Sequence, residues 1–200
     1  MGAVTVQRRR GRPPKGGDGP TTVERLLDAA VSACTELGYD GATIGDIGRR
    51  AGVSATAIYN HFPSRSELLV AAARRALDAV DAPAGHDRDV VAFARRTVQQ
   101  FLSPEHEGTR RLIAELHVAA RRHSDLADLL AVWHDERATE LAARIEGPTA
   151  ARLATAKAFF LILLGTCHVE ALAAIPASPA ATTSAVERAV AVVVEHRAAA

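Results

Sequence analysis

TIGDIGRRAGVSATAIYNHF, residues 43–62, predicts two short helices joined by a tight turn. Thr43 is suited to cap the first helix, and Asp46 to complement the free N–H groups of its first turn. Gly52 stands where that helix must stop, and Ser54 offers a hydroxyl to cap the second helix. Two short helices around a turn with glycine form the helix-turn-helix, whose second helix enters the DNA major groove. The segment is therefore expected to read DNA.

Residues 43–69, TIGDIGRRAGVSATAIYNHFPSRSELL, resemble the N-terminal signature of the TetR family of transcriptional repressors. That signature has an apolar-patterned helix, an A-G-V-S turn, an I/L-Y-x-H-F recognition helix and a polar S-K/R-x-x-L start to the next helix. The resemblance covers residues from about 21 to about 80. The remainder resembles the family only as a run of amphipathic helices.

The resemblance implies a set of DNA contacts within this segment. Phosphate contacts are implied for Thr43, Tyr59, His61 and Arg65, the last standing where the family commonly has lysine. The exposed positions of the recognition helix are Ser54, Ala55, Thr56 and Asn60. Of these, Thr56 and Asn60 are expected to reach base edges and Ala55 a thymine methyl group. For Tyr59 the alternative is a ring packed in the small core.

Composition favours a helical, soluble, cytoplasmic protein. Of 200 residues, 48% are hydrophobic and only 4% aromatic, and Ala and Leu are abundant. Cys34 and Cys167 fall in apolar helical patterns, which fits buried thiols in a reducing compartment. No apolar signal region follows the basic N-terminus, and the most apolar run, residues 158–164, is shorter than the roughly 20 residues of a membrane span. No membrane partner is expected.

Positive charge is concentrated toward the N-terminus. Residues 1–80 hold 11 Lys and Arg against 8 Asp and Glu, whereas residues 81–200 hold 13 against 15. Residues 1–20 lack apolar periodicity and are expected to form a disordered basic arm. Its Gly-Arg-Pro core with flanking basic residues resembles an AT-hook that enters a narrow minor groove, through Arg8, Arg9, Arg10 and Arg12. The alternative is a solvated tail that attracts phosphates without sequence preference.

The rest of the chain predicts an all-α protein of two domains. Residues 21–80 form the helix-turn-helix DNA-binding domain with its connecting helix, and residues 86–200 an effector-binding and dimerisation domain. Capping boxes begin at Thr21 and Ser64, Gly38 is a natural stop, and Pro63 is expected to end the recognition helix after Phe62. Later helices are expected at about 88–102, 109–123, 124–145, 149–174 and 182–197.

The last two helices are apolar on nearly every side. Residues 159–165 read FFLILLG and residues 190–194 read VAVVV. A helix that is apolar all round must be covered all round, and a second copy of the same helix pair would cover both about a two-fold axis. A homodimer through these helices is therefore expected; burial within one subunit is the alternative.

The middle helices are where the TetR family places an inducer pocket. The sequence supplies apolar, aromatic and scattered polar candidates for it: Phe93, Phe101, Leu116, His117, Trp133, His134, Phe160, Cys167 and His168. The same residues also fit an ordinary helical core. Neighbouring Cys167 and His168 point about 100° apart on a helix, so no metal site is expected.

The sequence contains no GxSxG, P-loop or HExxH motif, so neither catalysis nor a cofactor is expected. The pattern as a whole predicts a ligand-responsive repressor. It would bind a palindromic DNA operator as a homodimer and be released by a small, largely apolar effector. Two alternatives stay open: an architectural DNA-binding protein without an effector, and a small-molecule-binding helical bundle.

Overall fold

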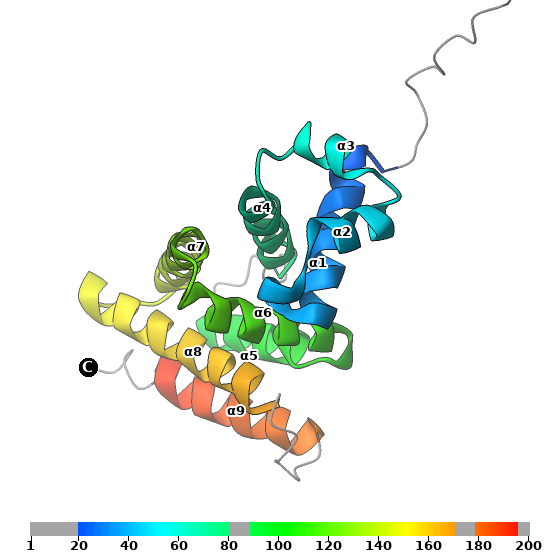
Figure 1. Ribbon diagram of the computed structural model, residues 1–200. Coiled ribbons are helices and arrows are strands. Elements are labelled where there is room, and N and C mark those ends of the chain that lie inside the picture. The colour runs from blue at the N-terminus through cyan, green and yellow to red at the C-terminus, as the bar shows by residue number, and fades with distance from the viewer. Residues whose placement is uncertain (1–19, 81–88, 171–178, 196–200) are drawn as a thin grey trace, which may run out of the picture.

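A computed structural model describes residues 20–80, 89–170 and 179–195, and within these ranges the chain is helical and has no strand (Figure 1). The all-α prediction is thereby confirmed. The elements are α1 (Thr22–Gly41), α2 (Ile44–Ala51), α3 (Ala55–Tyr59), α4 (Arg65–Asp78), α5 (Val90–Phe101), the short η1 (Pro104–His106), α6 (Glu107–Ala120), α7 (Ser124–Ala142), α8 (Thr149–Glu170) and α9 (Pro179–Glu195).

The first four helices begin at the side chains that the sequence indicates. Thr21 accepts from the backbone N–H of Glu24, whose carboxylate accepts from the N–H of Thr21 in return, which completes a capping box. Thr43 caps α2, Ser54 caps α3 and Ser64 caps α4, each accepting from the backbone N–H three residues on. These caps satisfy N–H groups that the helices themselves leave without partners.

The helices form a small N-terminal group on top of a larger bundle (Figure 1). Helix α1 packs against α2, α4 and α6, so it contacts both the helix-turn-helix and the bundle. Helices α5 to α9 make the bundle, with α8 against α6, α7 and α9, and α5 against α9. Helix α3 lies at one end of the molecule, and the α8–α9 pair lies at the other.

Several helix ends differ from the prediction. The recognition helix stops at Tyr59 rather than Phe62, because the chain turns at Asn60 before Pro63 is reached. Gly38 does interrupt α1, with φ of 76°, but one further turn follows it. Helix α7 ends at Ala142, before Ile145. His123 occupies its N-cap position.

Helix α9 begins at Pro179, three residues before the expected start, because proline fits the first turn of a helix, where its missing N–H is not needed. A linker is expected at 81–89, of which residues 81–88 lie outside the described residues, as does the expected end of the preceding helix at 171–174. The division into domains at 80 and 86 stays a prediction.

Helix α8 corrects one premise of the sequence analysis. Residues 149–169 are long and apolar enough, by length and composition alone, to cross a membrane, although only 28% of that stretch is buried within the subunit. The helix nevertheless packs in the bundle, with Phe159 fully buried and Leu163 buried beside it. Its outer face remains uncovered, with Leu161 68% exposed.

Candidate DNA-binding face, domain junction and ligand cavity

The residues predicted to contact DNA lie on a common exposed surface at the α3 end of the molecule. This DNA-binding face comprises Thr43, Ser54, Ala55, Thr56, Tyr59, Asn60 and His61, all of which are exposed. Tyr59 is 51% exposed, so the alternative of a ring packed in the core is wrong. The side of α3 opposite this face carries Ile58, which is fully buried. One side of the helix therefore holds it in place while the other is presented to solvent.

The turn between α2 and α3 depends on two glycines. Gly52 ends α2 in the left-handed conformation, with φ of 67°. A Cβ on Gly48 would lie 2.8 Å from the backbone oxygen of Val53 and 3.4 Å from the Ile58 side chain. The close approach of α2 to the turn therefore requires glycine at position 48.

Arg65 makes different contacts from the one that the sequence suggests. Its Nε donates to the carbonyl oxygen of Ala42 at 2.8 Å, and its Nη2 donates to the carbonyl oxygens of Tyr39 and Asp40, the latter at 3.2 Å. Its guanidinium carbon also lies 5.6 Å from the centroid of the Tyr39 ring. These contacts hold the end of α1 against the start of α4 and replace the expected phosphate contact with a structural role.

The basic arm, with Arg8, Arg9, Arg10 and Arg12, lies outside the described residues. Within them, Arg49 at the end of α2 is a cation that the predicted contacts did not include. Its side chain is 72% exposed and is paired with Asp46. Neighbouring Arg50 instead binds Glu36 of α1 at 2.6 Å, which joins α2 to α1.

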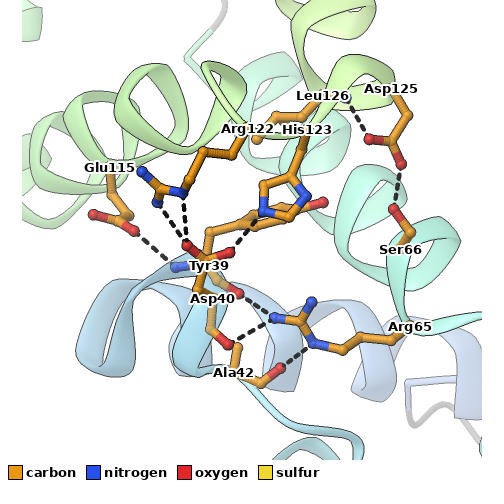
Figure 2. Close-up of polar contacts among 10 residues, drawn as sticks. All are labelled: Tyr39, Asp40, Ala42, Arg65, Ser66, Glu115, Arg122, His123, Asp125 and Leu126. Atoms are coloured by element: carbon orange, nitrogen blue, oxygen red, sulfur yellow. Dashed lines mark hydrogen bonds and ion pairs between the residues drawn. The ribbon is translucent and has the colours of Figure 1, made fainter.

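The end of α1 meets the corner between α6 and α7 in a polar junction (Figure 2). Asp40 accepts from Arg122 and lies 2.6 Å from His123 Nε2, while Glu115 of α6 accepts from the backbone N–H of Tyr39 at 2.9 Å. Hydrogen bonds from His123 and Arg122 hold the pKa of Asp40 below its ordinary value, so the carboxylate is charged at neutral pH. We call Tyr39, Asp40, Glu115, Arg122 and His123 the junction cluster.

A second link joins α4 to α7 at the same corner, where Ser66 donates to Asp125 (Figure 2). This hydrogen bond lowers the pKa of the Asp125 carboxyl group. Asp125 also accepts from the N–H of Leu126 at 3.0 Å. Both helices that support the DNA-binding face, α1 and α4, are therefore tied to the α6–α7 corner by hydrogen bonds.

A partly enclosed cavity lies within the bundle between α5, α6, α7 and α8. This inner cavity holds about 70 Å³ and is lined mostly by apolar and aromatic side chains: Val80, Phe93, Thr97, Gln100, Phe101, His106, Ile113, Trp133, His134, Arg137, Glu140, Leu141, Phe159, Phe160, Leu163 and Leu164. Arg137 pairs with Glu140 at 3.4 Å. The charges on its wall therefore neutralise each other.

A larger and more open cavity of about 370 Å³ adjoins it. This outer cavity is lined by His117, Ala131, His134, Asp135, Ala138, Lys157, Phe160, Leu161 and Leu164. The two cavities share the walls made by His134, Phe160 and Leu164. We call these three half-buried side chains the partition.

Two histidines face each other beside the partition. Nδ1 of His117 lies 2.7 Å from the carbonyl oxygen of Ile113, and its Nε2 lies 2.8 Å from Nε2 of His134. A carbonyl oxygen only accepts, so His117 carries its proton on Nδ1 and His134 donates from Nε2. Burial lowers the pKa of both rings, that of His134 to about 4, so both are neutral at pH 7.

The structure brings together six of the nine residues predicted to bind a ligand. Phe93, Phe101, Trp133, His134 and Phe160 line the inner cavity, and His117 lines the outer one. Leu116 and Cys167 are buried in the core and line neither. His168 is exposed, with its Nδ1 2.9 Å from the Leu164 carbonyl oxygen. Leu116 and Cys167 are therefore core residues and His168 is a surface residue, and none of the three lines a cavity.

Sequence reasoning missed the polar members of the cavity wall. Thr97 and Gln100 follow Phe93 by four and seven residues, on the same face of α5, and Arg137 lies four residues after Trp133 on α7. Extending each aromatic position by helical spacing would have found them. Among the described residues, no group of three histidine, cysteine or acidic side chains is arranged to hold a metal ion.

An exposed helix-turn-helix at one end of a helical bundle is the arrangement of a DNA-binding transcriptional regulator. Residues 26–72 match the model of the family described as "Bacterial regulatory proteins, tetR family". An uncharacterized HTH-type transcriptional regulator of Mycobacterium bovis, Mb2936c, is 32% identical over 118 residues, which are 54% of this chain and 58% of that protein. Residues 26–72 therefore carry the DNA-binding domain of the TetR family of transcriptional regulators.

Solved structures share the whole fold. A TetR-family regulator from Rhodococcus sp. superposes with a TM-score of 0.74 at 24% identity, over 86% of this chain and 98% of its own. The multidrug binding protein EbrR, solved with malachite green, superposes with a TM-score of 0.68 at 20% identity, over 88% and 99% of the two chains. At these identities the similarity establishes the fold. The match to the curated relative spans little more than half of that protein.

Proposed function

We propose that the protein is a ligand-responsive transcriptional repressor that binds a palindromic DNA operator as a homodimer and is released by a small, largely apolar effector. The observation that carries this proposal is the DNA-binding face, on which the predicted contacts of α2 and α3 lie together and exposed. A single recognition helix covers few base pairs, so specific binding calls for two copies on two half-sites. A dimer bound over a promoter would block transcription from it.

The uncovered face of α8 and α9 supports the homodimer. Leu161, Val169 and Val192 are 68%, 36% and 58% exposed on the described surface of these two helices. Large exposed apolar residues gathered on adjacent helices mark interaction sites in soluble proteins. A two-fold axis through this face would cover it with a second copy of itself and supply a second DNA-binding face.

Helix α6 supports a route from effector to DNA. It contributes Ile113 to the inner cavity and His117 to the outer one, and Glu115 between them belongs to the junction cluster. A ligand that moves α6 would therefore alter the hydrogen bond that holds the end of α1. The effector would shift the equilibrium between a DNA-binding and a released arrangement by its difference in affinity for the two.

The cavities distinguish this proposal from an architectural protein without an effector. The outer cavity, at about 370 Å³, falls within the range of small-molecule sites, which runs from about 300 to 1,000 Å³. A ligand-responsive repressor therefore accounts for the outer cavity, whereas an architectural DNA-binding protein would have no use for it.

The test is to select operator DNA from a random duplex pool and to measure affinity by fluorescence anisotropy at several salt concentrations. We expect a palindromic site bound by two subunits, with affinity that falls steeply as salt rises.

Thr56→Ala should change base preference at one position in each half-site and leave the salt dependence unchanged, since its contact is to a base. Thr139 is exposed on α7, so Thr139→Ala provides a matched control remote from the DNA-binding face. Absence of salt-dependent duplex binding would contradict the proposal.

A further inference from the structure

Trp133 carries a buried hydrogen-bond donor that the described structure leaves unsatisfied. The side chain is 6% exposed and lines the inner cavity. Among the residues that the structure describes, its indole Nε1 has no hydrogen-bond partner. Leaving a buried N–H without a partner is energetically unfavourable, so an acceptor placed there gains affinity beyond that of apolar contact.

The walls of the inner cavity disfavour a charged ligand. His134 and His117 are neutral at pH 7, because burial lowers the pKa of each. The Arg137 guanidinium is balanced by Glu140, and the Arg144 guanidinium carbon lies 4.4 Å from the centroid of the Phe93 ring, which also lines the cavity. A cation would meet the Arg137 guanidinium on the cavity wall, while an anion would compete with Glu140 for that same group. Either would lose its hydration without a free counter-charge.

The size of the cavity decides how a ligand is accommodated. At about 70 Å³ the inner cavity is smaller than the roughly 150 Å³ apolar cavity known to hold benzene. The partition separates it from the outer cavity of about 370 Å³. Phe160 and Leu164 of the partition are half-buried side chains on one helix, so their rotation would join the two spaces. A ligand of aromatic size must therefore occupy both cavities.

We propose that the joined cavities bind an uncharged, mainly apolar molecule with one carbonyl-type oxygen, which accepts a hydrogen bond from Nε1 of Trp133. This inference rests on the proposed function, since it gives the chemical class of the effector that the repressor reading requires. Trp133 is then the residue that determines specificity. Apolar and aromatic side chains, including Phe101 and Phe159, surround the body of the ligand.

Four probes of equal size and different polarity test the class. Acetophenone, isopropylbenzene, benzoate and benzamidinium share a phenyl ring and a branched three-atom substituent, and they differ in oxygen content and charge. Because the chain has a single tryptophan, one indole N–H resonance in a two-dimensional ¹H–¹⁵N NMR spectrum of the full chain reports on Trp133. We expect acetophenone to move this resonance downfield and to bind about threefold to tenfold tighter than isopropylbenzene, as one net hydrogen bond implies.

The matched variant is Trp133→Phe, which keeps an aromatic ring and removes the N–H. It should bind acetophenone and isopropylbenzene equally, as measured by calorimetry. Tighter binding of benzoate or benzamidinium than of acetophenone by the wild-type protein would overturn the proposal, as would an indole resonance that none of the four probes moves. The wild-type spectra decide the question even if the variant does not fold.

DNA binding is measured on the same wild-type sample. Salt-dependent duplex binding without any probe binding would reject the ligand class and leave the DNA-binding part of the proposed function standing. Loss of both would reject the proposed function as well.

Discussion

At the scale of single residues, the molecule depends on positions where backbone groups come close together. Gly48 lets α2 approach the turn before α3, and Arg65 draws three carbonyl oxygens at the end of α1 toward the start of α4. Gly48 lies within the helix-turn-helix and Arg65 begins the helix that follows it, and neither belongs to the exposed DNA-binding face. Each is expected to act on DNA binding through the position of α3.

Gly48→Ala and Gly45→Ala form a matched pair on α2. The added Cβ at position 48 would lie 2.8 Å from the Val53 oxygen, whereas at position 45 its nearest neighbour is Thr43 Oγ1 at 3.7 Å. Urea unfolding should show Gly48→Ala destabilised by about 1–3 kcal/mol, the usual cost of overpacking. Gly45→Ala should be neutral or stabilised by up to about 1 kcal/mol, because alanine favours helix. Equal effects of the two substitutions would contradict the close approach at Gly48.

Arg65→Ala separates a structural role from a phosphate contact. Removal of the guanidinium strips the end of α1 of three hydrogen bonds from a charged donor, so the free energy of unfolding should fall by about 2 kcal/mol. The salt dependence of DNA affinity should stay as in the wild type. A shallower salt slope with unchanged stability would restore the phosphate contact that the sequence suggests.

At the scale of elements, the sequence predicted which helices form far better than which side chains hold them together. Thr21, Thr43, Ser54 and Ser64 act locally, so their capping role follows from spacing alone. The carbonyl ends of helices are different. Arg65, Arg110 and Arg152 each donate to carbonyls at the end of another helix, those of α1, α5 and α7 respectively. These partners lie 23, 9 and 10 residues apart on different helices, so helical spacing does not connect them.

The candidate sites divide in the same way. The DNA-binding face lies on a short local motif, so its exposed residues follow from the helix period. The cavity draws on four helices, and sequence identified most of its aromatic members but not Phe159, Thr97 or Arg137. The junction cluster joins Asp40 to Arg122 and His123 across more than eighty positions, and no periodicity connects them.

The contact between α6 and α7 predicts a dependence of stability on pH. His117 and His134 have lowered pKa values in the folded protein, that of His134 about 4, against about 6.5 for an unfolded histidine. Between these values the unfolded chain binds more protons than the folded one. The stability that the neutral histidines contribute is therefore fully present above about pH 6.5 and is lost as pH falls toward 4. We expect the melting temperature to fall by about 3 °C or more between pH 7 and pH 5.

His134→Gln is the matched variant for this effect, since its amide can still donate to His117 and does not titrate. Its melting temperature, measured by circular dichroism, should decrease less over the same pH interval than that of the wild type. Other groups that titrate in this range contribute equally to both proteins, so the difference isolates the histidine. Identical pH profiles for the two proteins would contradict the lowered pKa of His134.

At the scale of the whole molecule, the uncovered faces lie at opposite ends. The DNA-binding face occupies the α3 end, and the apolar face of α8 and α9 occupies the other (Figure 1). In the proposed function, the α3 end binds DNA and the α8–α9 end binds a second subunit, which carries a second DNA-binding face. The cavities and the junction cluster lie between them, on the elements that connect the two tasks.

Leu161→Lys tests the assembly at this scale. Leu161 is 68% exposed in the single subunit, so lysine should leave the fold intact while placing two charges in the proposed dimer interface. We expect sedimentation analysis to give dimers for the wild type and monomers for the variant, with operator affinity reduced at least tenfold. Lys157, which is already charged and exposed on α8, offers Lys157→Arg as the control. Unchanged assembly of Leu161→Lys would place the interface elsewhere.

The three intrinsic fluorophores of the chain other than phenylalanine are divided among its working parts. The single tryptophan, Trp133, lines the inner cavity, while Tyr59 lies on the DNA-binding face and Tyr39 is buried in the junction cluster. Fluorescence excited at a wavelength that only indole absorbs comes from Trp133, so it reports on the inner cavity. Unlabelled protein can serve as its own optical sensor, and compound libraries can be screened by emission colour without a dye, a tag or knowledge of the operator.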